Sequence, residues 1–267
     1  MSTRFGIIGG GVMAEAILSR LLDRKLYLPE DILISEPQAQ RREFLASTYG
    51  VRVSEDNRQA ASASEVLLLA IKPQALDTVL TGLLGVMEKP LVLSILAGVP
   101  LSRLESGFPD RAVIRVMPNT PATVGEGMTA IAPGRRVEPQ HLDLARDIFT
   151  AVGEVEEVPE SLMDAVTGLS GSGPAFVAIL IEALADGGVA AGLPRPVAAR
   201  LALQTVLGTA VFLKESQLHP AQLKDRVTSP GGTTIAGVTR LEKGGYRSAI
   251  IEAVVAAYQR SRELGRS

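Results

Sequence analysis

"RFGIIGGGVMAEAILSRLLDR" (residues 4–24) joins a short apolar run to a helical pattern through three consecutive glycines. The order Gly9-x-Gly11-x-x-Ala14 is the spacing of a dinucleotide-binding turn between a strand and a helix. The first glycine permits a tight bend, the second lets the backbone approach a pyrophosphate, and the small third residue lets helix and strand pack closely. Because a helix start binds phosphates, we expect dinucleotide contacts from Gly9, Gly10, Gly11, Val12 and Met13.

The alternation of apolar runs and helical patterns continues to about residue 159. We expect strands over 4–9, 31–36, 51–54, 65–71, 90–98 and 112–119, helices over 11–24, 38–48, 74–87 and 100–108, and then the segments 128–134 and 154–159 on either side of a helix over 139–153. Strands that alternate with helices predict an α/β fold with a Rossmann-like, doubly wound parallel sheet. The continuous apolar character of 65–71 agrees, because strands buried on both faces lack polar alternation.

The sequence after Pro159 shows only helical periods, rich in Ala and Leu. We therefore predict two domains, a dinucleotide-binding domain over 1–158 and an all-helical domain over 159–267. Large apolar area on Ala-rich helices is typical of a subunit interface. An ordinary helical core would give the same composition.

The chain has 267 residues, a net charge of −2, no Cys and two His. The lack of Cys excludes disulfides, thiolate nucleophiles and Cys-based metal sites, and we expect no metal. His141 and His219 are expected to be solvated surface residues. Catalysis must then run without a His base or a Cys nucleophile, which favours a cofactor that carries the hard chemistry.

Composition also indicates where the protein works. No basic patch stands out, so nucleic acid is not an expected partner. The longest apolar run, 66–71, is too short to span a bilayer, and the first residues lack a signal-peptide pattern. We therefore expect a cytoplasmic protein without a membrane partner.

Residues that follow the other strands are candidates for further cofactor contacts, because ligands of such sheets bind at the carboxyl ends of strands. Glu36 would accept hydrogen bonds from a free ribose 2′-OH and favour NAD, whereas Ser35 with Arg41 or Arg42 would hold a 2′-phosphate and favour NADP. Both interpretations stand. The turns after the later strands add candidates, namely Ala70, Lys72, Pro73, Ala97 and Asn119.

A second glycine-rich stretch, "RVTSPGGTTIAGV" (226–238), has no His, Cys or carboxylate. Taken alone, its "SPGG" is an ordinary β-turn. Together with "VIRVMPNTPATVGEGMTAI" (113–131), "AVTGLSGSGPAFVAILIEALADGGVAAGLP" (165–194) and "LKDRVTSPGGTTIAGVTRLE" (223–242), it resembles the pyrroline-5-carboxylate reductase family over essentially the whole chain.

The resemblance implies an N-terminal Rossmann domain and a helical domain that interlocks into a dimer, which can assemble further into a decamer. It implies hydride transfer from NADPH or NADH to the C=N bond of 1-pyrroline-5-carboxylate, which gives L-proline in the last step of proline biosynthesis. Feedback by proline and activity on the six-membered imine stay open.

The resemblance also implies site residues. Thr234 would be the catalytic hydroxyl at the ring nitrogen, and Asn57 would contact the cofactor. Apart from the resemblance, the position of Ser172 before Pro174 predicts that its side chain caps the helix that Pro174 begins. Glu36 departs from the Asn, Arg or Ser of many family members, which leaves the choice between NADP(H) and NAD(H) undecided. The backbone of the loop would hold the substrate carboxylate through Ser229, Gly231, Gly232, Thr233 and Thr234.

Overall fold

The computed structural model describes residues 3–86 and 88–265, which form two units by their internal contacts. Unit 1 extends to Ser172 and takes in the chain again from Ala257, and unit 2 is Gly173–Ala256. The division predicted from sequence at 158/159 follows secondary structure instead, since the last strand ends at Glu157. It stays a prediction, and residues 159–172 pack with the sheet-bearing unit.

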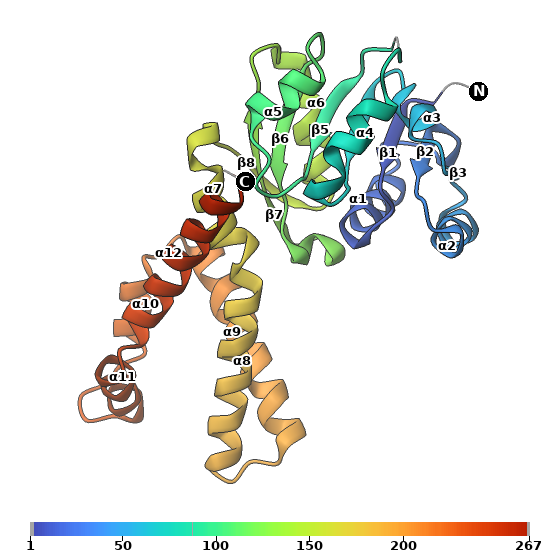
Figure 1. Cartoon of the computed structure of the whole chain (residues 1–267). Coiled ribbons are helices and arrows are strands. Elements are labelled where there is room, and N and C mark those ends of the chain that lie inside the picture. Colours follow the sequence, from blue (N-terminus) through green and yellow to red (C-terminus); the bar gives the residue numbers. More distant parts are fainter. Residues whose placement is uncertain (1–2, 87, 266–267) are drawn as a thin grey trace. The chain divides into compact units, whose positions relative to one another are not determined.

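An eight-stranded sheet in the order β3-β2-β1-β4-β5-β6-β7-β8 forms the middle of unit 1 (Figure 1). The six strands from β3 to β6 are parallel in the Rossmann order, and the order reverses between β1 and β4. The strands are β1 (Phe5–Ile8), β2 (Ile32–Ser35), β3 (Arg52–Ser54), β4 (Val66–Leu69), β5 (Leu91–Ser94), β6 (Val113–Met117), β7 (Gly127–Pro133) and β8 (Gly153–Glu157).

The predicted parallel pairing is wrong at one place. β7 runs antiparallel to β6, and β8 is parallel to β7. The cause is the link 118–126, which holds only the short 3-10 helix Thr120–Val124. A parallel connection needs a crossover of a dozen or more residues, so a link of this length turns the chain back.

Helices cover both faces of the sheet, as a doubly wound fold requires. One apolar cluster joins a face of the sheet to α1 (Val12–Asp23), α2 (Ala39–Tyr49) and α6 (Pro139–Thr150). The other joins the opposite face to α3 (Asn57–Ala61), α4 (Leu76–Gly82) and α5 (Leu101–Gly107). The Rossmann-like architecture is confirmed.

Two helical predictions differ from the structure in unit 1. The helix expected over 74–87 is shorter, since the 3-10 turn Pro73–Ala75 leads into α4, which ends at Gly82. Residue 87 lies outside the described residues. α3 was not predicted at all, because five residues are too few to show a helical period.

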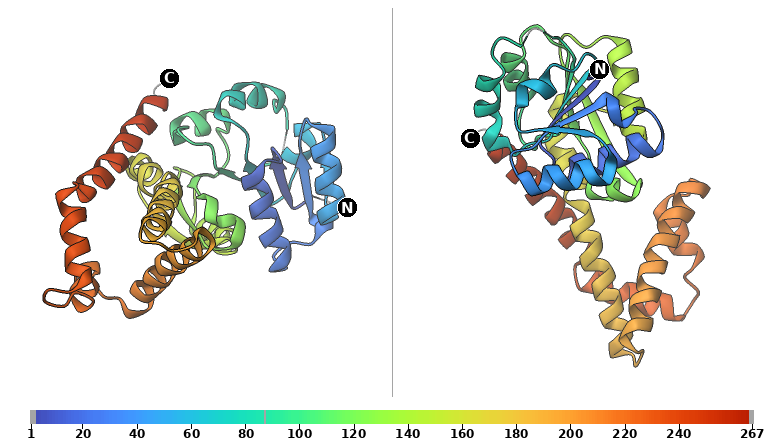
Figure 2. Two further views of the ribbon diagram at one scale, coloured as in Figure 1. Left: turned by 90° about the horizontal axis from the view of Figure 1, so that it is seen from below. Right: turned by 90° about the vertical axis from the view of Figure 1, so that its right-hand side faces the viewer.

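Unit 2 is helical throughout, as expected. It contains α8 (Gly173–Ala190), α9 (Arg195–Ser216), α10 (Pro220–Arg226), α11 (Thr233–Lys243) and the first part of α12 (Tyr246–Leu264). α8 and α9 form an antiparallel hairpin (Figure 2). Its buried core is small, consisting of Ala185, Ala198 and Ala202.

Much apolar surface in unit 2 is exposed. Ile179 is 64% exposed, Leu203 56% and Ile251 63%. Two helical stretches, Glu160–Ala190 and Arg195–Ser216, are long and apolar enough to cross a membrane, with 6% and 11% of their apolar windows buried. Small buried cores and wide apolar faces indicate that another surface covers these helices.

Both histidines cap helices. His219 is exposed, as predicted, and its Nδ1 accepts the Ala221 N–H at 3.2 Å. His141 is half-buried rather than fully solvated, and its Nδ1 accepts the Glu138 N–H at 3.0 Å. Helix N-termini leave N–H groups without partners, and these two imidazoles satisfy such groups. Among the described residues, no cluster of His, Asp or Glu is suited to hold a metal ion.

Candidate functional site

The glycine turn between β1 and α1 has the geometry that its spacing predicts. Gly9 has φ +98°, and a Cβ at this position would lie 2.5 Å from the Ala70 carbonyl oxygen. Its N–H donates to the Ser35 carbonyl oxygen at 2.8 Å. Only glycine fits this position, because the left-handed conformation and the nearby backbone both exclude a side chain.

The start of α1 offers free N–H groups. Gly11 is the N-cap residue, no side chain caps the helix, and the first helical bond runs from the Glu15 N–H to the Gly11 carbonyl. Gly11 is exposed, and a Cβ there would meet nothing within 4 Å. Val12 is 71% exposed and Met13 is half-buried. An open helix start with unbonded N–H groups and the positive end of the dipole fits a pyrophosphate.

Glu36 lies directly against this turn. It is 8% exposed, and one carboxylate oxygen accepts the Gly10 N–H at 2.9 Å while the other accepts the Gln38 N–H at 2.9 Å. The carboxylate therefore fixes the turn and places a negative charge beside it.

Ser35 and Asn57 meet at the end of β2. Ser35 is buried, and its hydroxyl donates to Asn57 Oδ1 at 2.7 Å. This bond leaves the Asn57 amide NH₂ as the available donor. The pair stands where the ribose end of a dinucleotide lies in a Rossmann fold.

Arg41 and Arg42 are not free charges in the structure. Arg41 donates to the Gly10 carbonyl at 2.6 Å and forms an ion pair with Glu15. Arg42 donates to the carbonyls of Glu36 and Pro37, each at 2.8 Å. Both side chains are mostly buried, and both support the segment around the glycine turn.

The Arg41 pair extends to Tyr49, whose hydroxyl donates to Glu15 at 2.8 Å. Burial alone would raise the pKa of the Glu15 carboxyl, but the hydrogen bonds from Arg41 and Tyr49 and the Arg41 charge outweigh it and lower that pKa. Burial, followed by the bond to Glu15, raises the pKa of Tyr49 to about 12. Sequence reasoning missed Glu15 and Tyr49, because no local pattern links positions 34 apart.

The remaining predicted cofactor contacts follow β4, β5 and β6. Ala70 and Pro73 are half-buried, whereas Lys72 and Ala97 are exposed. The Ala70 N–H donates to the Ile8 carbonyl at 2.9 Å, which joins its turn to the end of β1. All four lie after carboxyl ends of parallel strands, the side on which such sheets bind ligands.

Asn119 is engaged by protein groups. Its Oδ1 accepts the Met128 N–H at 2.9 Å, and its amide NH₂ donates to the Ser170 hydroxyl at 3.2 Å and to the Ser170 carbonyl at 3.3 Å. In this structure Asn119 therefore orients a loop. Ser170 lies in a single π-helical turn, Thr167–Gly171, a form often found at functional sites.

The predicted capping role of Ser172 is wrong. Its hydroxyl donates to the Thr167 carbonyl at 3.1 Å, and its N–H donates to the same oxygen at 2.9 Å. The chain passes from α7 (Met163–Val166) through the π turn into α8 with helical angles at Ser172. α8 therefore continues directly from the π turn, and the Ser172 side chain does not cap its start.

The loop 229–234 in unit 2 forms a second open helix start. Gly231 has φ +68°, and a Cβ at Gly232 would lie 2.3 Å from Ser229 Oγ. Gly232 is the N-cap of α11 without a side-chain cap, and the first helical bond runs from the Ala236 N–H to its carbonyl. Thr233 is exposed and Thr234 half-buried. Free N–H groups and two hydroxyls at the start of an 11-residue helix suit a carboxylate.

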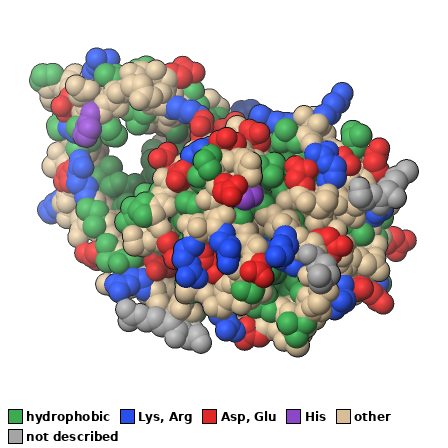
Figure 3. Space-filling model, turned by 90° about the horizontal axis from the view of Figure 1, so that it is seen from above, with side chains coloured by type: hydrophobic (Ala, Val, Ile, Leu, Met, Phe, Trp, Pro, Cys, Tyr) green, Lys and Arg blue, Asp and Glu red, His purple; other side chains and the backbone are tan. Residues whose placement is uncertain are grey.

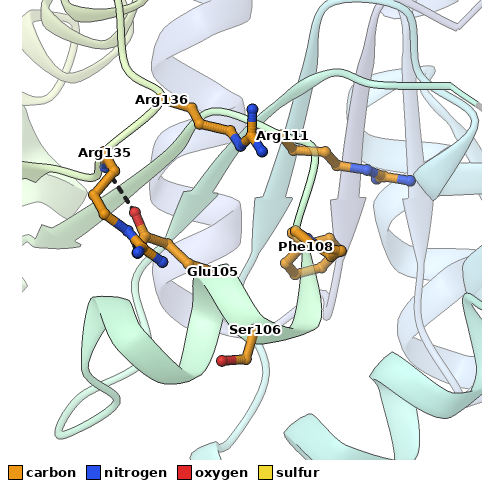
Figure 4. Close-up of a pocket in the computed structure, with 7 residues that line it drawn as sticks. Glu105, Ser106, Phe108, Arg111, Arg135 and Arg136 are labelled. Atoms are coloured by element: carbon orange, nitrogen blue, oxygen red, sulfur yellow. Dashed lines mark hydrogen bonds and ion pairs between the residues drawn. The ribbon is translucent and has the colours of Figure 1, made fainter.

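A cavity that adjoins α5 lies apart from the candidate site residues (Figure 4). It has a volume of about 390 Å³, and Arg135 turns toward Glu105 at its wall, where Arg135 Nε donates to the carboxylate at 2.8 Å. Its lining comes from α5, the turn after it and the turn after β7, at the amino end of β6. None of the candidate cofactor or substrate residues lines it.

The face drawn in Figure 3 bears Lys and Arg side chains interspersed with Asp and Glu. Mixed signs of this kind give no broad field of one charge.

Two protein-family models match the chain. Residues 160–264 match the model described as pyrroline-5-carboxylate reductase dimerisation, and residues 4–98 match the model described as NADP oxidoreductase, coenzyme F420-dependent. Together they cover the glycine turn and the loop 229–234.

Relatives resemble the chain over its whole length. A pyrroline-5-carboxylate reductase of Synechocystis is 68% identical over all of both chains. The solved structure of a pyrroline-5-carboxylate reductase from Coxiella burnetii has a TM-score of 0.91 and 35% identity, with both chains fully covered. The structure of the Plasmodium falciparum enzyme with NADP bound has a TM-score of 0.89 and 31% identity, with 98% of each chain covered.

Proposed function

This chain belongs to the pyrroline-5-carboxylate reductase family, and from that premise we propose which of its residues carry the reaction. The enzyme reduces the C=N bond of 1-pyrroline-5-carboxylate with NADPH or NADH and forms L-proline, the last step of proline biosynthesis. A bound nicotinamide supplies the hydride. The protein must therefore bind the cofactor and the substrate, orient them toward each other and exclude water from between them.

We assign cofactor binding to the edge of the sheet in unit 1. The single observation that carries this assignment is the open start of α1 behind Gly9, where φ is +98° and no side chain fits. The N–H groups after Gly11 would bind the pyrophosphate, and Ser35, Glu36 and Asn57 would meet the adenosine ribose. The exposed Ala97 and Lys72 and their neighbours Ala70 and Pro73 would line the side toward the nicotinamide.

We assign substrate binding to the loop 229–234. The N–H groups in the first turn of α11 would bind the carboxylate, because neither Gly231 nor Gly232 carries a side chain over them. The Gly232 N–H itself donates to the Ser229 carbonyl at 3.1 Å and stays within the loop. The Thr234 hydroxyl would accept the hydrogen bond from the protonated ring nitrogen and keep that proton on nitrogen as hydride reaches carbon. A protonated imine is already a good hydride acceptor, so no stronger acid is required.

Self-association goes with this assignment, since the matched family model is a dimerisation domain. The exposed apolar faces of α8 and α9 support a second copy as the surface that covers them. A dimer interface would explain why the two helical stretches are apolar, so that no membrane is needed to cover them. Assembly of dimers into a decamer, a cytoplasmic location and the lack of a nucleic-acid or membrane partner are parts of the same proposal.

Oxidation of NADPH and NADH with and without 1-pyrroline-5-carboxylate tests the activity. The Thr234→Ala variant should lose at least about tenfold in kcat/KM for the imine, since a hydrogen bond to a charged group is removed, and should keep its Kd for the cofactor. Thr234→Ser should restore most of the activity. Thr239→Ala is the matched control, because the Thr239 hydroxyl only donates to the Ile235 carbonyl of its own helix. Equal activity in Thr234→Ala would remove Thr234 from the reaction.

A further inference from the structure

A buried arginine joins two carboxylates in the middle of unit 1. The Arg115 side chain on β6 is 7% exposed. Its two terminal nitrogens lie 3.4 Å from Glu160 and 3.8 Å from Asp164. A buried cation is tolerated only with partners, so these contacts fix where the three side chains lie.

Each carboxylate also holds a second element. Glu160 accepts the N–H of Leu101, the first residue of α5. Asp164 accepts the Ser261 hydroxyl at 2.8 Å, and Ser261 is 5% exposed near the end of α12. Arg115 thus stands between the start of α5 and the end of α12.

The loop 97–100, the last part of the link between β5 and α5, lies at this junction. A Cβ on Gly265 would lie 2.9 Å from the Gly98 carbonyl oxygen, so the chain at the end of α12 packs directly on the loop. Two cavities adjoin the contact and share Gly98. One, of about 140 Å³, reaches Asp164, and the other, of about 230 Å³, reaches Ser261 and Ala97.

We infer that Arg115, Asp164 and Ser261 are positioning residues that hold the loop 97–100 in the conformation that receives the cofactor. The inference rests on the proposed function, in which Ala97 contacts the cofactor. A loop outside helix and strand must be ordered to bind, and ordering it in advance raises affinity. None of the three residues needs to touch the reacting atoms, so the effect falls on cofactor affinity and not on the hydride step.

Ser261→Ala in the full-length protein tests the network. The Kd for NADPH, measured by fluorescence titration, and the cofactor KM should rise about tenfold, as expected for loss of a hydrogen bond to a charged group. The value of kcat at saturating cofactor should stay unchanged. Ser261→Thr should restore the Kd, because it keeps the hydroxyl. Asp164→Asn should give a smaller rise, since it still accepts from Ser261 but no longer neutralises Arg115.

Ser248→Ala is the matched control on the same helix. The Ser248 hydroxyl donates to an exposed carboxylate, Glu252, at 2.7 Å, so its removal should leave the Kd unchanged. An unchanged Kd in Ser261→Ala would overturn the inference. A lower kcat with an unchanged KM, or a higher Kd that Ser261→Thr does not restore, would overturn it as well.

Ala97→Leu separates this inference from the proposed function. If Ala97→Leu weakens cofactor binding while Ser261→Ala does not, the loop contacts the cofactor, and only the positioning role of Ser261 is wrong. If Ala97→Leu binds the cofactor normally, the proposed contact fails and the inference falls with it. A weaker Kd in both variants, restored by Ser261→Thr, is the result we expect.

Discussion

The glycine turn of unit 1 (residues 9–11) and the loop 229–234 of unit 2 both lead into a helix, but they differ in how deeply they are buried. Both leave a helix start without a side-chain cap, and a Cβ would strike nearby atoms at Gly9 in the turn and at Gly232 in the loop. Gly9 is buried directly after β1, beside Ala70, whereas Gly231 is exposed in a helical unit with a small buried core. One site is therefore held by a large core of its own chain, and the other needs a covering surface to become rigid.

Substitution of Gly9 should give the largest effect and tests the first half of this comparison. Gly9→Val should abolish measurable cofactor binding, at least about 100-fold, because a left-handed backbone strains a β-branched residue and the Ala70 carbonyl leaves no space. Isothermal titration calorimetry with NADPH measures the dissociation constant.

Gly11→Ala is the matched variant, since a Cβ there meets nothing within 4 Å. It should fold with an unchanged melting temperature and bind the cofactor more weakly by a smaller factor. Equal losses of cofactor affinity in the two variants would contradict the distinction between Gly9, where a side chain clashes with the backbone, and Gly11, where it has space.

A charged residue introduced on the apolar face of α8 tests the second half of the comparison, that unit 2 needs a covering surface. Ile179→Glu should shift the protein from a dimer toward single chains of 28.1 kDa and reduce turnover, because a carboxylate cannot be buried at an apolar interface without a partner. Sedimentation velocity measures the mass.

Leu84→Glu is the control for this experiment, since Leu84 is an apolar residue of unit 1 that is 72% exposed. It should leave the mass and the activity unchanged. A dimer that survives Ile179→Glu would show that α8 is covered by something else.

A smaller effect is expected from Glu36, and it concerns the balance of cofactors. Glu36→Gln removes a negative charge beside the turn and the ribose position, so the ratio of kcat/KM for NADPH over NADH should rise about fivefold, a Coulomb effect of about 1 kcal/mol. Steady-state rates with both cofactors measure the ratio. Glu55→Gln changes an exposed carboxylate that pairs with Arg42 at 3.5 Å, and it should leave the ratio near the parent value.

The smallest effect concerns the support behind the glycine turn. Tyr49→Phe should cost about 1 kcal/mol of folding free energy by removing the bond to Glu15. Because the pKa of Tyr49 is raised from 10.0 to about 12, its contribution is fully present below pH 10 and is lost as the pH rises to about 12. Urea unfolding of both proteins at pH 8 and pH 11.5 measures the difference, which should shrink at the higher pH. A constant difference would contradict the assigned pKa.

The strands β1, β2, β4 and β5 could be predicted because their sequences are almost continuously apolar, and Val66–Leu69 is wholly buried. The direction of β7 was not readable, since an apolar run does not reveal whether its neighbour is parallel. The length of the link 118–126 held that information. The turn Gly9-x-Gly11 could be predicted from its spacing, whereas the role of the loop 229–234 came from the resemblance to the family.

The contacts around the glycines were less predictable. Glu36 was identified for the ribose, yet its carboxylate also bonds to Gly10, 26 positions away. Arg115 and Ser261 are linked through Asp164 although they lie about half the chain apart. A local sequence pattern cannot predict a contact between such distant positions. Asn119 was a candidate cofactor contact, and no local pattern indicated its hydrogen bonds to Ser170 and Met128.

The course of α12 limits how the protein can be cut into modules. The chain leaves unit 1 after Ser172, builds unit 2 and returns to unit 1 at Ala257, in the middle of a single helix. Exchange of unit 2 with that of a relative therefore needs two crossover points rather than one. A chimera joined only at 158/159 would take Ser261 and Asp164 together from the new parent but Arg115 from the old one, so sequences on the two sides must change in concert.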